Sequence, residues 1–530
     1  MKVLKKIFLP SGEEVTIPTV KPDQKTNLND LEYLNFNDFQ GLAINGIPKV
    51  FGTKALMGHS AACSYMTIYD SADDSFLQIE MPGGNRIYGN LGAKSEVTPS
   101  GKVLVGTGTA GHEMWIVDIA NGTVQTIAMP QGATPTAVAW GYNFCISPFL
   151  AGTTRCFVGH GTNGLGANLP RAEVDVETGV VTEIACPNTV NYIIGSLNMI
   201  MNGDKLLLPT GTAGISFMYK FSTKTITQLP NSTPAVIIAP SFTHSELVGN
   251  KMLMGSTTSS AALPIFNWDT ETWSSVTMPA NLIWGSNIKL ISPAVNGVVF
   301  VDNSVADTVA AFVDITNGTV TSVSPASAIY GSNFSFSEPV GNRCLVSRNA
   351  NAQTVAILDF GTKTVVESAN TGINTVYGNA HAFGRPRNGR ILVATNNANG
   401  NLLELDVATG TIYKITITIG TVTFGLSNSF IYLTPDLILA LAAGPVQMLI
   451  DYRDNPTSNT PEIKYLSRYV INAAPSAQAN IQGYGEAFNI GPISGGNNGG
   501  GYNRARVGSK QLLFCATLMA LAWLVDVNKL

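Results

Sequence analysis

Short apolar runs that end in a turn signal recur along the whole chain. In the stretch 114–130, MWIVDIANGTVQTIAMP, an apolar run ends at Asp118, a turn follows at Asn121-Gly122, and an alternating strand comes next. Asn-Gly between two strand patterns predicts a hairpin, because both residues tolerate the positive φ that such a turn requires. The pattern therefore predicts a protein built from short antiparallel strands.

The Val-Asp ending of the apolar run recurs at regular intervals. Lys220 and Asn267 occupy the position in the fourth and fifth copies. So many repeated acids are poor candidates for catalysis, and we expect each carboxylate to accept hydrogen bonds from turn amides at the end of a strand. The acids are Asp70, Asp118, Asp175, Asp314, Asp359, Asp406, Asp451 and Asp526.

Two further strands complete each repeat. One begins at an aromatic residue followed by Gly, and we expect that aromatic side chain to pack between neighbouring repeats, with a sugar-binding platform as the alternative. Such residues include Tyr88, Trp140, Trp284, Tyr330, Tyr377, Phe424 and Tyr484. A second, apolar strand begins at Lys102, Lys205, Lys251, Val298 and Arg390. Ten copies of four short strands, with a period of about 45 to 50 residues, indicate β-propeller blades.

The two ends of the chain indicate how the repeat would close. The last copy, 521–530, has a Val-Asp strand but no outer strand, and residues 1–10 look like the missing strand. We therefore predict an all-β fold, a propeller of about ten four-stranded blades in 38–530. Residues 1–10 would pair with the last blade, which would remove free sheet edges, and 11–37 would form an irregular arm. Two smaller propellers are the alternative, because ten blades exceed the usual four to eight.

Two resemblances follow from these patterns. The stretch 391–415, ILVATNNANGNLLELDVATGTIYKI, resembles the YVTN-type repeat of β-propeller proteins, and 297–323 is a looser copy. This resemblance implies a fold and no particular activity. The Asn-, Thr- and Gly-rich, charge-poor composition is similar to that of structural proteins of tailed-phage virions, some of whose tail proteins carry propellers. It implies a virion component.

Composition and charge narrow the range of partners. Charged residues make up 12% of the chain and the net charge is −4, without a dense basic run, so nucleic acid is not expected as the main partner. The most apolar stretch, 512–525, is too short for a membrane-spanning helix. We expect a pair of buried strands there, with a tail anchor as the alternative. The N-terminus does not have the pattern of a secretory signal.

The six cysteines do not form a CxxC pair, which argues against structural zinc. We expect them to be small buried hydrophobic residues. Cys145 and Cys156 could be neighbours across two strands.

Candidate chemistry is sparse, and we expect no catalytic, cofactor-binding or metal site. The GxGxxG at 106–111 is followed by a strand pattern, whereas a nucleotide site needs a helix there. The acidic stretch 70–74 lacks the Gly and the later Glu of a calcium loop. We expect solvated or capped histidines, because a metal site would need several imidazoles to converge. Those considered are His59, His112, His160, His244 and His381, of which the last two lie on innermost strands.

These observations favour a non-enzymatic structural or interaction protein. We expect a tail or capsid-associated virion component of a tailed phage that docks onto copies of itself or onto other virion proteins. The irregular segments 11–37, 159–170 and 493–503 would give specificity. A carbohydrate-binding or hydrolytic propeller, with a host-surface glycan as partner, and a bacterial surface or adhesion protein are the alternatives. The innermost strands are poor in ionisable groups, which argues against hydrolysis. Nearly all of these groups are Glu96, Lys289, Glu338, His381 and Glu486.

Overall fold

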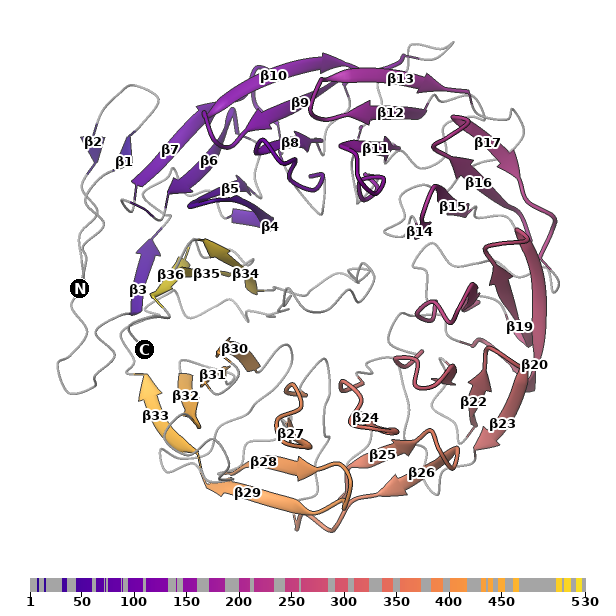
Figure 1. Cartoon of the computed structure of the whole chain (residues 1–530). Coiled ribbons are helices and arrows are strands. Elements are labelled where there is room, and N and C mark those ends of the chain that lie inside the picture. The colour runs from indigo at the N-terminus through magenta and orange to yellow at the C-terminus, as the bar shows by residue number, and fades with distance from the viewer. Residues whose placement is uncertain are drawn as a thin grey trace. The chain divides into compact units, whose positions relative to one another are not determined.

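A computed structural model gives the placement of most of the repeat units. The residues that it describes are 7–8, 14–15, 31–35, 44–59, 63–70, 72, 75–86, 88, 94–107, 111–131, 140, 146–159, 171–185, 200–209, 214–232, 244–256, 259–284, 291–303, 309–323, 336–346, 353–372, 383–393, 401–416, 430–434, 437–441, 447–452, 461–466, 502–507, 510–515 and 521–526. Every regular element among them is a β-strand (Figure 1). The all-β prediction is therefore confirmed.

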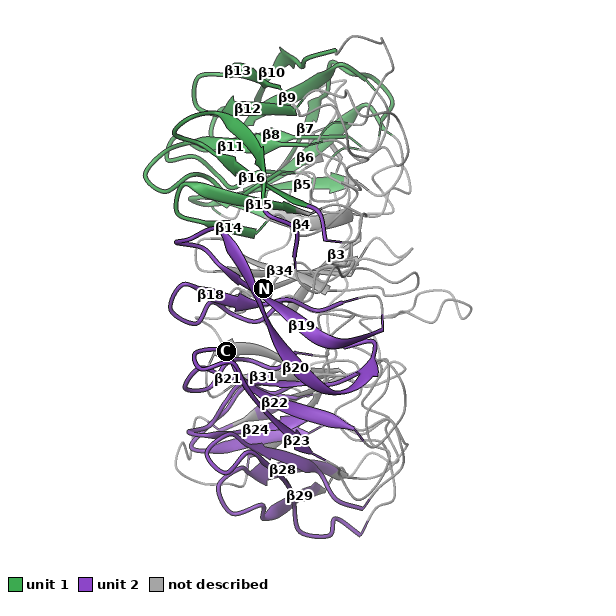
Figure 2. Ribbon diagram, turned by 90° about the vertical axis from the view of Figure 1, so that its right-hand side faces the viewer, with its two compact units in different colours: residues 1–212, 216–229, 473–530 green, residues 213–215, 230–472 purple. Residues whose placement is uncertain are grey.

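The chain divides into two compact units (Figure 2). Unit 1 comprises Met1–Thr212, Ser216–Leu229 and Ala473–Leu530. Unit 2 comprises Ala213–Ile215 and Pro230–Asn472. Unit 1 therefore combines the beginning and the end of the chain.

Unit 1 contains a six-stranded sheet and four smaller antiparallel sheets over its described residues. The first sheet, in the order β2-β1-β7-β6-β5-β4, is formed by β1 (Ile7–Phe8), β2 (Glu14–Val15), β4 (Ile44–Phe51), β5 (Lys54–His59), β6 (Tyr65–Asp70) and β7 (Ser75–Glu80). The next three are β8 (Lys102–Val105), β9 (Glu113–Asp118), β10 (Thr123–Ala128); β11 (Arg155–Val158), β12 (Arg171–Asp175), β13 (Val180–Ile184); and β14 (Ile200–Asn202), β15 (Lys205–Pro209), β16 (Ser216–Lys220), β17 (Thr225–Gln228). The last, in the order β3-β36-β35-β34, is formed by β3 (Leu31–Asn35), β34 (Tyr502–Val507), β35 (Lys510–Cys515) and β36 (Leu521–Asp526).

Unit 2 contains small antiparallel sheets of three or four strands. They are β18 (Lys251–Leu253), β19 (Ser260–Asn267), β20 (Thr272–Leu282); β21 (Val298–Val301), β22 (Ala310–Asp314), β23 (Thr319–Val323); β24 (Arg343–Val346), β25 (Ala356–Asp359), β26 (Thr364–Glu367); β27 (Arg390–Val393), β28 (Asn401–Asp406), β29 (Ile412–Thr416); and β30 (Phe430–Thr434), β31 (Leu437–Leu441), β32 (Gln447–Asp451), β33 (Glu462–Leu466). In both units each sheet comes from one stretch of sequence, except for the strands added from the N-terminal segment.

The apolar runs of the sequence are strands with both faces buried. On β9, Met114 and Ile116 pack towards the sheet of β11–β13, whereas Trp115 and Val117 pack towards the sheet of β4–β7. Successive side chains of a strand point to opposite faces, so a strand between two sheets needs a continuous apolar run. The outer strand β10 is exposed at Thr123, Gln125, Thr126 and Ala128 and buried at Ile127, so it does not need a continuous apolar run.

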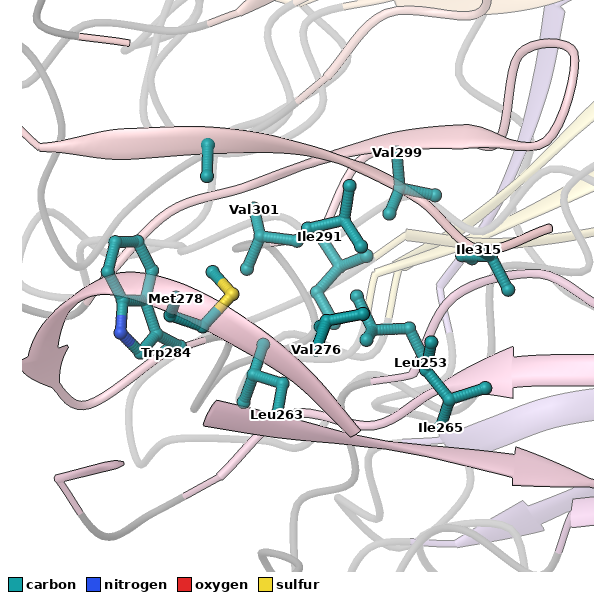
Figure 3. Close-up of a cluster of buried hydrophobic side chains, with 12 residues drawn as sticks. Leu253, Leu263, Ile265, Val276, Met278, Trp284, Ile291, Val299, Val301 and Ile315 are labelled. Atoms are coloured by element: carbon teal, nitrogen blue, oxygen red, sulfur yellow. The ribbon is translucent and has the colours of Figure 1, made fainter. Parts of the chain in front are cut away.

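The same stacking recurs in unit 2, where hydrophobic side chains fill the space between the sheets of β18–β20 and β21–β23 (Figure 3). Trp284, the aromatic residue of its repeat, is fully buried in this cluster, and Trp140 and Tyr88 are buried in equivalent clusters. The packing role predicted for these aromatic residues is thus confirmed, because a buried ring cannot serve as a sugar platform. Tyr330, Tyr377, Phe424 and Tyr484 lie outside the described residues.

The repeat acid, as we name the position of Asp118 in each copy, ends the third strand of the predicted four-strand repeat, for example β9, β12 and β28. The Asp118 carboxylate accepts the backbone N–H of Asn121 at 3.0 Å, and Asp406 accepts those of Ala408 and Thr409 at 3.1 and 2.9 Å. The predicted turn-capping role is therefore confirmed. Equivalent bonds occur at Asp70, Asp175, Asn267, Asp314 and Asp359.

The turn after the repeat acid differs from the prediction. Asp118 pairs with Thr123, so four residues form the loop, and among them only Gly122 has a positive φ, of 68°. Asn121 instead donates its Nδ2 to Asp118 at 2.8 Å. The expectation that both Asn121 and Gly122 take positive φ was wrong, because the longer loop needs one left-handed residue, four positions after the acid.

The N-terminal pairing also differs from the prediction. Ile7–Phe8 (β1) pairs in parallel with β7 of the first sheet, and not with the last sheet as expected for residues 1–10. The outer strand of the last sheet is β3, Leu31–Asn35, which pairs antiparallel with β36. The segment 11–37, expected to be an irregular arm, therefore supplies a strand. Strand pairing uses backbone groups that every segment carries, so the side-chain pattern did not identify this strand.

The apolar stretch 512–525 contributes to the paired strands β35 and β36, as expected. None of the described residues belongs to a helix long and apolar enough to cross a membrane.

Candidate functional site

We number the strands by their place in the predicted four-strand repeat, so that β8 and β21 are second strands. The inner segment, as we name the residues just before the second strand of each repeat, carries most of the ionisable groups considered for function. In several sheets it meets the second strand through a single β-bridge rather than a full strand. These bridges join Lys94 to Val105, Ile146 to Val158, His244 to Met254, Ile291 to Val301, Phe336 to Val346 and Phe383 to Val393.

A buried serine follows the bridging residue in most of these inner segments. The Ser292 hydroxyl accepts the Phe300 amide at 2.8 Å and donates to the Pro293 carbonyl at 2.9 Å. It thus replaces a backbone partner where the ladder is interrupted, so that the buried amide is satisfied. Ser95, Ser147, Ser245 and Ser337 make the same pair of bonds.

Acids of the inner segment contact the inner segment of the following sheet. The Glu96 carboxylate accepts the backbone N–H of Phe149 at 2.9 Å, and Glu338 lies 4.0 Å from the guanidinium of Arg385. Burial raises the pKa of Glu338, and the charge of Arg385 opposes the rise. Two of the acids that the sequence placed on innermost strands, Glu96 and Glu338, therefore connect neighbouring sheets. Lys289, His381 and Glu486 lie outside the described residues.

In several sheets a basic residue stands opposite the repeat-acid position and connects that sheet to the next one. Lys102 pairs in register with Asp118, and its Nζ donates to the backbone carbonyl of Glu177 at 2.6 Å. We call this bond, from the first residue of a second strand to the carbonyl two positions after the next repeat acid, the inter-sheet lock. It recurs from Lys54 to Ala120 at 2.6 Å, from Lys251 to Thr316 at 3.0 Å and from Arg343 to Ala408 at 2.5 Å.

Two buried glutamates, Glu173 on β12 and Glu404 on β28, reinforce the contact between sheets. Glu173 pairs with Arg155 at 2.9 Å and accepts the Tyr219 hydroxyl of the next sheet at 2.6 Å. Burial raises the pKa of Tyr219, and its bond to Glu173 adds to the rise.

Glu404 repeats this arrangement in unit 2. It lies 3.7 Å from Arg390 and accepts the Tyr452 hydroxyl at 3.2 Å. Burial raises its pKa. Because each carboxylate bonds a tyrosine of the following sheet, we interpret both clusters as structural.

Two lysines of the inner segments depart from the pattern of the other repeats. Lys94 is only 6% exposed, and its Nζ has no hydrogen-bond partner among the described residues. Burial, aided by the charge of Lys49, lowers its pKa to about 7. Lys49 lies on β4 opposite Leu56. Burial lowers the pKa of Lys49, and the charge of Glu96 opposes this lowering.

The histidines do not converge where the structure describes them. No group of three or more His, Cys, Asp or Glu that could hold a metal ion occurs among the described residues. His244 bonds the Ser245 carbonyl through Nδ1 at 2.8 Å, and burial lowers its pKa. His112 belongs to the described residues, and His59 is the last residue of β5. His160 and His381 lie outside the described residues.

Other candidate motifs agree with the structural interpretation. The glycines at 106–111 precede strand β9, which confirms the strand predicted after them. Cys63, Cys156 and Cys344 are buried free thiols, as predicted for small hydrophobic residues. Cys145 lies outside the described residues, and Cys156 donates to the Val174 carbonyl.

Sequence reasoning missed the inter-sheet lock and the two inner lysines. The signal for the lock is a Lys or Arg opposite the repeat acid. It occurs at Lys54, Lys102, Lys251 and Arg343, which make the lock, and also at Arg155, Lys205, Arg390 and Lys510. The signal for the lysines is the buried serine: aligned on Ser95, the inner segments show Lys94 where other copies have Ile, Phe or His.

No protein-family model matches the chain, and no curated protein matches it either. Among solved structures, it is similar to the dihydro-heme d1 dehydrogenase NirN in complex with DHE, at 12% identity over 66% of this chain and 75% of that chain, with a TM-score of 0.39. It is also similar to apo AztD from Citrobacter koseri, at 11% identity over 61% of this chain and 84% of that chain, with a TM-score of 0.33. Likenesses this low carry no argument about function. The fold class rests on the sheets themselves: the chain is an all-β protein with many small antiparallel sheets, consistent with propeller-like folds.

Proposed function

We propose that the sheets are blades of one closed β-propeller of about ten blades, built from a YVTN-type repeat. Two observations support a single ring. The repeat acid pairs with the first residue of the outer strand in several sheets, for example Asp118 with Thr123 and Asp175 with Val180. The pairing of β3 with β36 joins strands from both ends of the chain in one sheet. Two successive smaller propellers would each keep to a continuous stretch of sequence. Unit 1 instead combines Met1–Thr212 and Ser216–Leu229 with Ala473–Leu530.

We propose that this propeller is a rigid docking platform, a tail or capsid-associated structural component of a tailed-phage virion. The observation that carries the proposal is the inter-sheet lock. Lysines and arginines that could act on a substrate instead hold one sheet to the next, as at Lys102 and Lys251. Paired with the charge-poor composition, this distribution favours a scaffold over a catalyst.

Docking specificity would come from the segments that the repeat does not require. These are 159–170 and 493–503, together with the N-terminal segment 11–37 outside β2 and β3. Partners would be other virion proteins or further copies of this chain. Irregular segments on a rigid scaffold are where binding residues concentrate.

Mass spectrometry of particles purified from cells that make the protein tests the proposal. We expect peptides of this chain at a fixed ratio to the major structural proteins, retained after density-gradient purification. Absence of the chain from every particle fraction would eliminate the virion role. Saturable binding of the isolated protein to an array of host glycans would favour the carbohydrate-binding alternative instead.

A further inference from the structure

We propose that Lys94 and Lys49 form a binding site for a small oxyanion, with phosphate or carboxylate chemistry, in the first two sheets of unit 1. The proposal does not depend on the virion role. It starts from the side chain of Lys94, which is 6% exposed and whose Nζ has no hydrogen-bond partner among the described residues. An isolated buried ammonium is strongly unfavourable unless it is paired or loses its proton.

The position of Lys94 makes the burial unusual. Lys94 forms the β-bridge to the second strand, and the equivalent bridging residues are mainly apolar: Ile146, His244, Ile291, Phe336 and Phe383. Isoleucine or phenylalanine therefore satisfies the packing of this position in other sheets. The lysine gives the fold no bond that the described residues show, so its charge requires another explanation.

A second, partly buried lysine comes from the preceding sheet. Lys49 pairs with Leu56 on the second strand of its sheet, as Ser95 pairs with Leu104 in the next one. It therefore stands at the buried-serine position, directly after the bridging position that Lys94 occupies. Leu56 and Val105, the strand partners of Lys49 and Lys94, belong to one hydrophobic cluster between the two sheets, so both lysines lie on the faces that meet there. The charge of Lys49 also contributes to lowering the pKa of Lys94.

The described residues supply little negative charge to compensate for the two lysines. No ion pair within 4.0 Å joins either lysine to an acid in the part of the chain that the structure describes. Glu96 acts on Lys49 at longer range, but its carboxylate already accepts the Phe149 amide at 2.9 Å. An incoming anion would complete the charge balance that the protein leaves open.

The chemistry of the two side chains identifies the class of ligand. An ammonium group has three donors and no acceptor, so it needs a ligand rich in lone pairs. Charge-assisted bonds to carboxylate or phosphate oxygens are among the strongest hydrogen bonds in proteins. A small oxyanion could accept from both lysines at once, whereas a neutral sugar could not balance their charge.

The test compares the full chain with Lys94→Met and Lys49→Met, and with Lys414→Met as a control at an exposed lysine on β29. The probes are inorganic phosphate and acetate, at ionic strength matched with sodium chloride. Binding is measured by calorimetry and by the shift of the thermal midpoint. We expect saturable binding of at least one anion by the unaltered chain and by Lys414→Met, and a loss of about tenfold or more in affinity in the other two variants.

A second readout separates binding from a purely structural lysine. Without added anion, Lys94→Met should unfold at a higher temperature than the unaltered chain, because an apolar side chain of similar length replaces an uncompensated buried charge. A structural lysine would instead give a lower midpoint. Preference for phosphate or for acetate would identify which oxyanion the site takes.

Equal anion affinity in Lys94→Met and the unaltered chain would overturn the proposal, as would the absence of saturable binding of both probes. If Lys94→Met does not fold, carbon-13 labelling of the lysine ε-carbons of the unaltered chain decides the question. Phosphate or acetate binding must then raise the pKa of one buried lysine, and an unchanged titration would overturn the proposal.

Discussion

Replacing Lys102 with Met should loosen the contact between two neighbouring sheets of unit 1. The Lys102 Nζ donates to the Glu177 carbonyl at 2.6 Å and lies 3.1 Å from its carboxylate. A hydrogen bond to a charged group contributes about 1.5–3 kcal/mol, whereas a partly exposed ion pair contributes about 0–1 kcal/mol. The Lys102 side chain is 28% exposed, so water can replace part of the lost bond, and we expect a cost of about 1–2 kcal/mol.

Hydrogen exchange measured by mass spectrometry is the suitable assay, because it resolves local opening in a long repeat protein. A cost of 1–2 kcal/mol corresponds to a factor of about 5–30 in the open population. Amides of 171–185 should therefore exchange about 5–30 times faster in Lys102→Met, whereas those of β22 and β23 in unit 2 should not change. Lys414→Met, at an exposed lysine on an outer strand, is the matched control.

A double-mutant comparison separates the two bonds of Lys102. Glu177→Gln removes the carboxylate charge but leaves the backbone carbonyl, so most of the effect of Lys102→Met should persist in that background. The lock is refuted if Lys102→Met speeds exchange no more than Lys414→Met does. It is equally refuted if the whole effect disappears in Glu177→Gln, since the surface ion pair would then account for it.

Three further predictions concern single positions. Lys363→Gly should raise the free energy of unfolding by about 0.5–1 kcal/mol, because Lys363 has a φ of 55° four positions after its repeat acid. Gly318→Ala, at the equivalent position, should lower the free energy of unfolding by about 1 kcal/mol. Urea titration measures both changes, and the same sign for both would contradict the turn geometry. Ser292→Ala should cost about 1–3 kcal/mol by leaving a buried amide unpaired, whereas an unchanged urea midpoint would mean that water replaces the hydroxyl. Burial alone would raise the pKa of Asp359, but hydrogen bonds from the Thr362 amide and from Arg343 lower this pKa below its ordinary value. The contribution of the Asp359 carboxylate to stability is therefore complete above about pH 4 and is lost as the pH falls further. Asp359→Asn should remove this part of the acid sensitivity in thermal scans from about pH 2 to about pH 6.

The sequence predicted the strands well because a short apolar run marks each strand that is buried on both faces. The run EMWIVD of β9 is apolar because both of its faces pack against neighbouring sheets, and the repeat acid marks its end. The turn type was less accessible. Lys224, Glu271 and Lys363 take positive φ without being glycine, so the left-handed position was not apparent from composition alone.

The pairing of the N-terminal strands could not be derived from side-chain patterns. Both Ile7–Phe8 and Leu31–Asn35 are short segments able to join a sheet edge, and the hydrogen bonds that choose between them belong to the backbone. The inner lysines were missed for a different reason. Aligning the repeats on the aromatic-Gly pair leaves Lys94 and Lys49 unrelated, whereas aligning them on the buried serine brings both to neighbouring positions.

Electron microscopy of the isolated full-length protein, carried to a density map that resolves strands, tests the central proposal most directly. We predict one ring of about ten blades in which β3 lies beside β36 in the last blade. Two separate smaller rings, or a last blade completed by residues 1–10, would contradict the account.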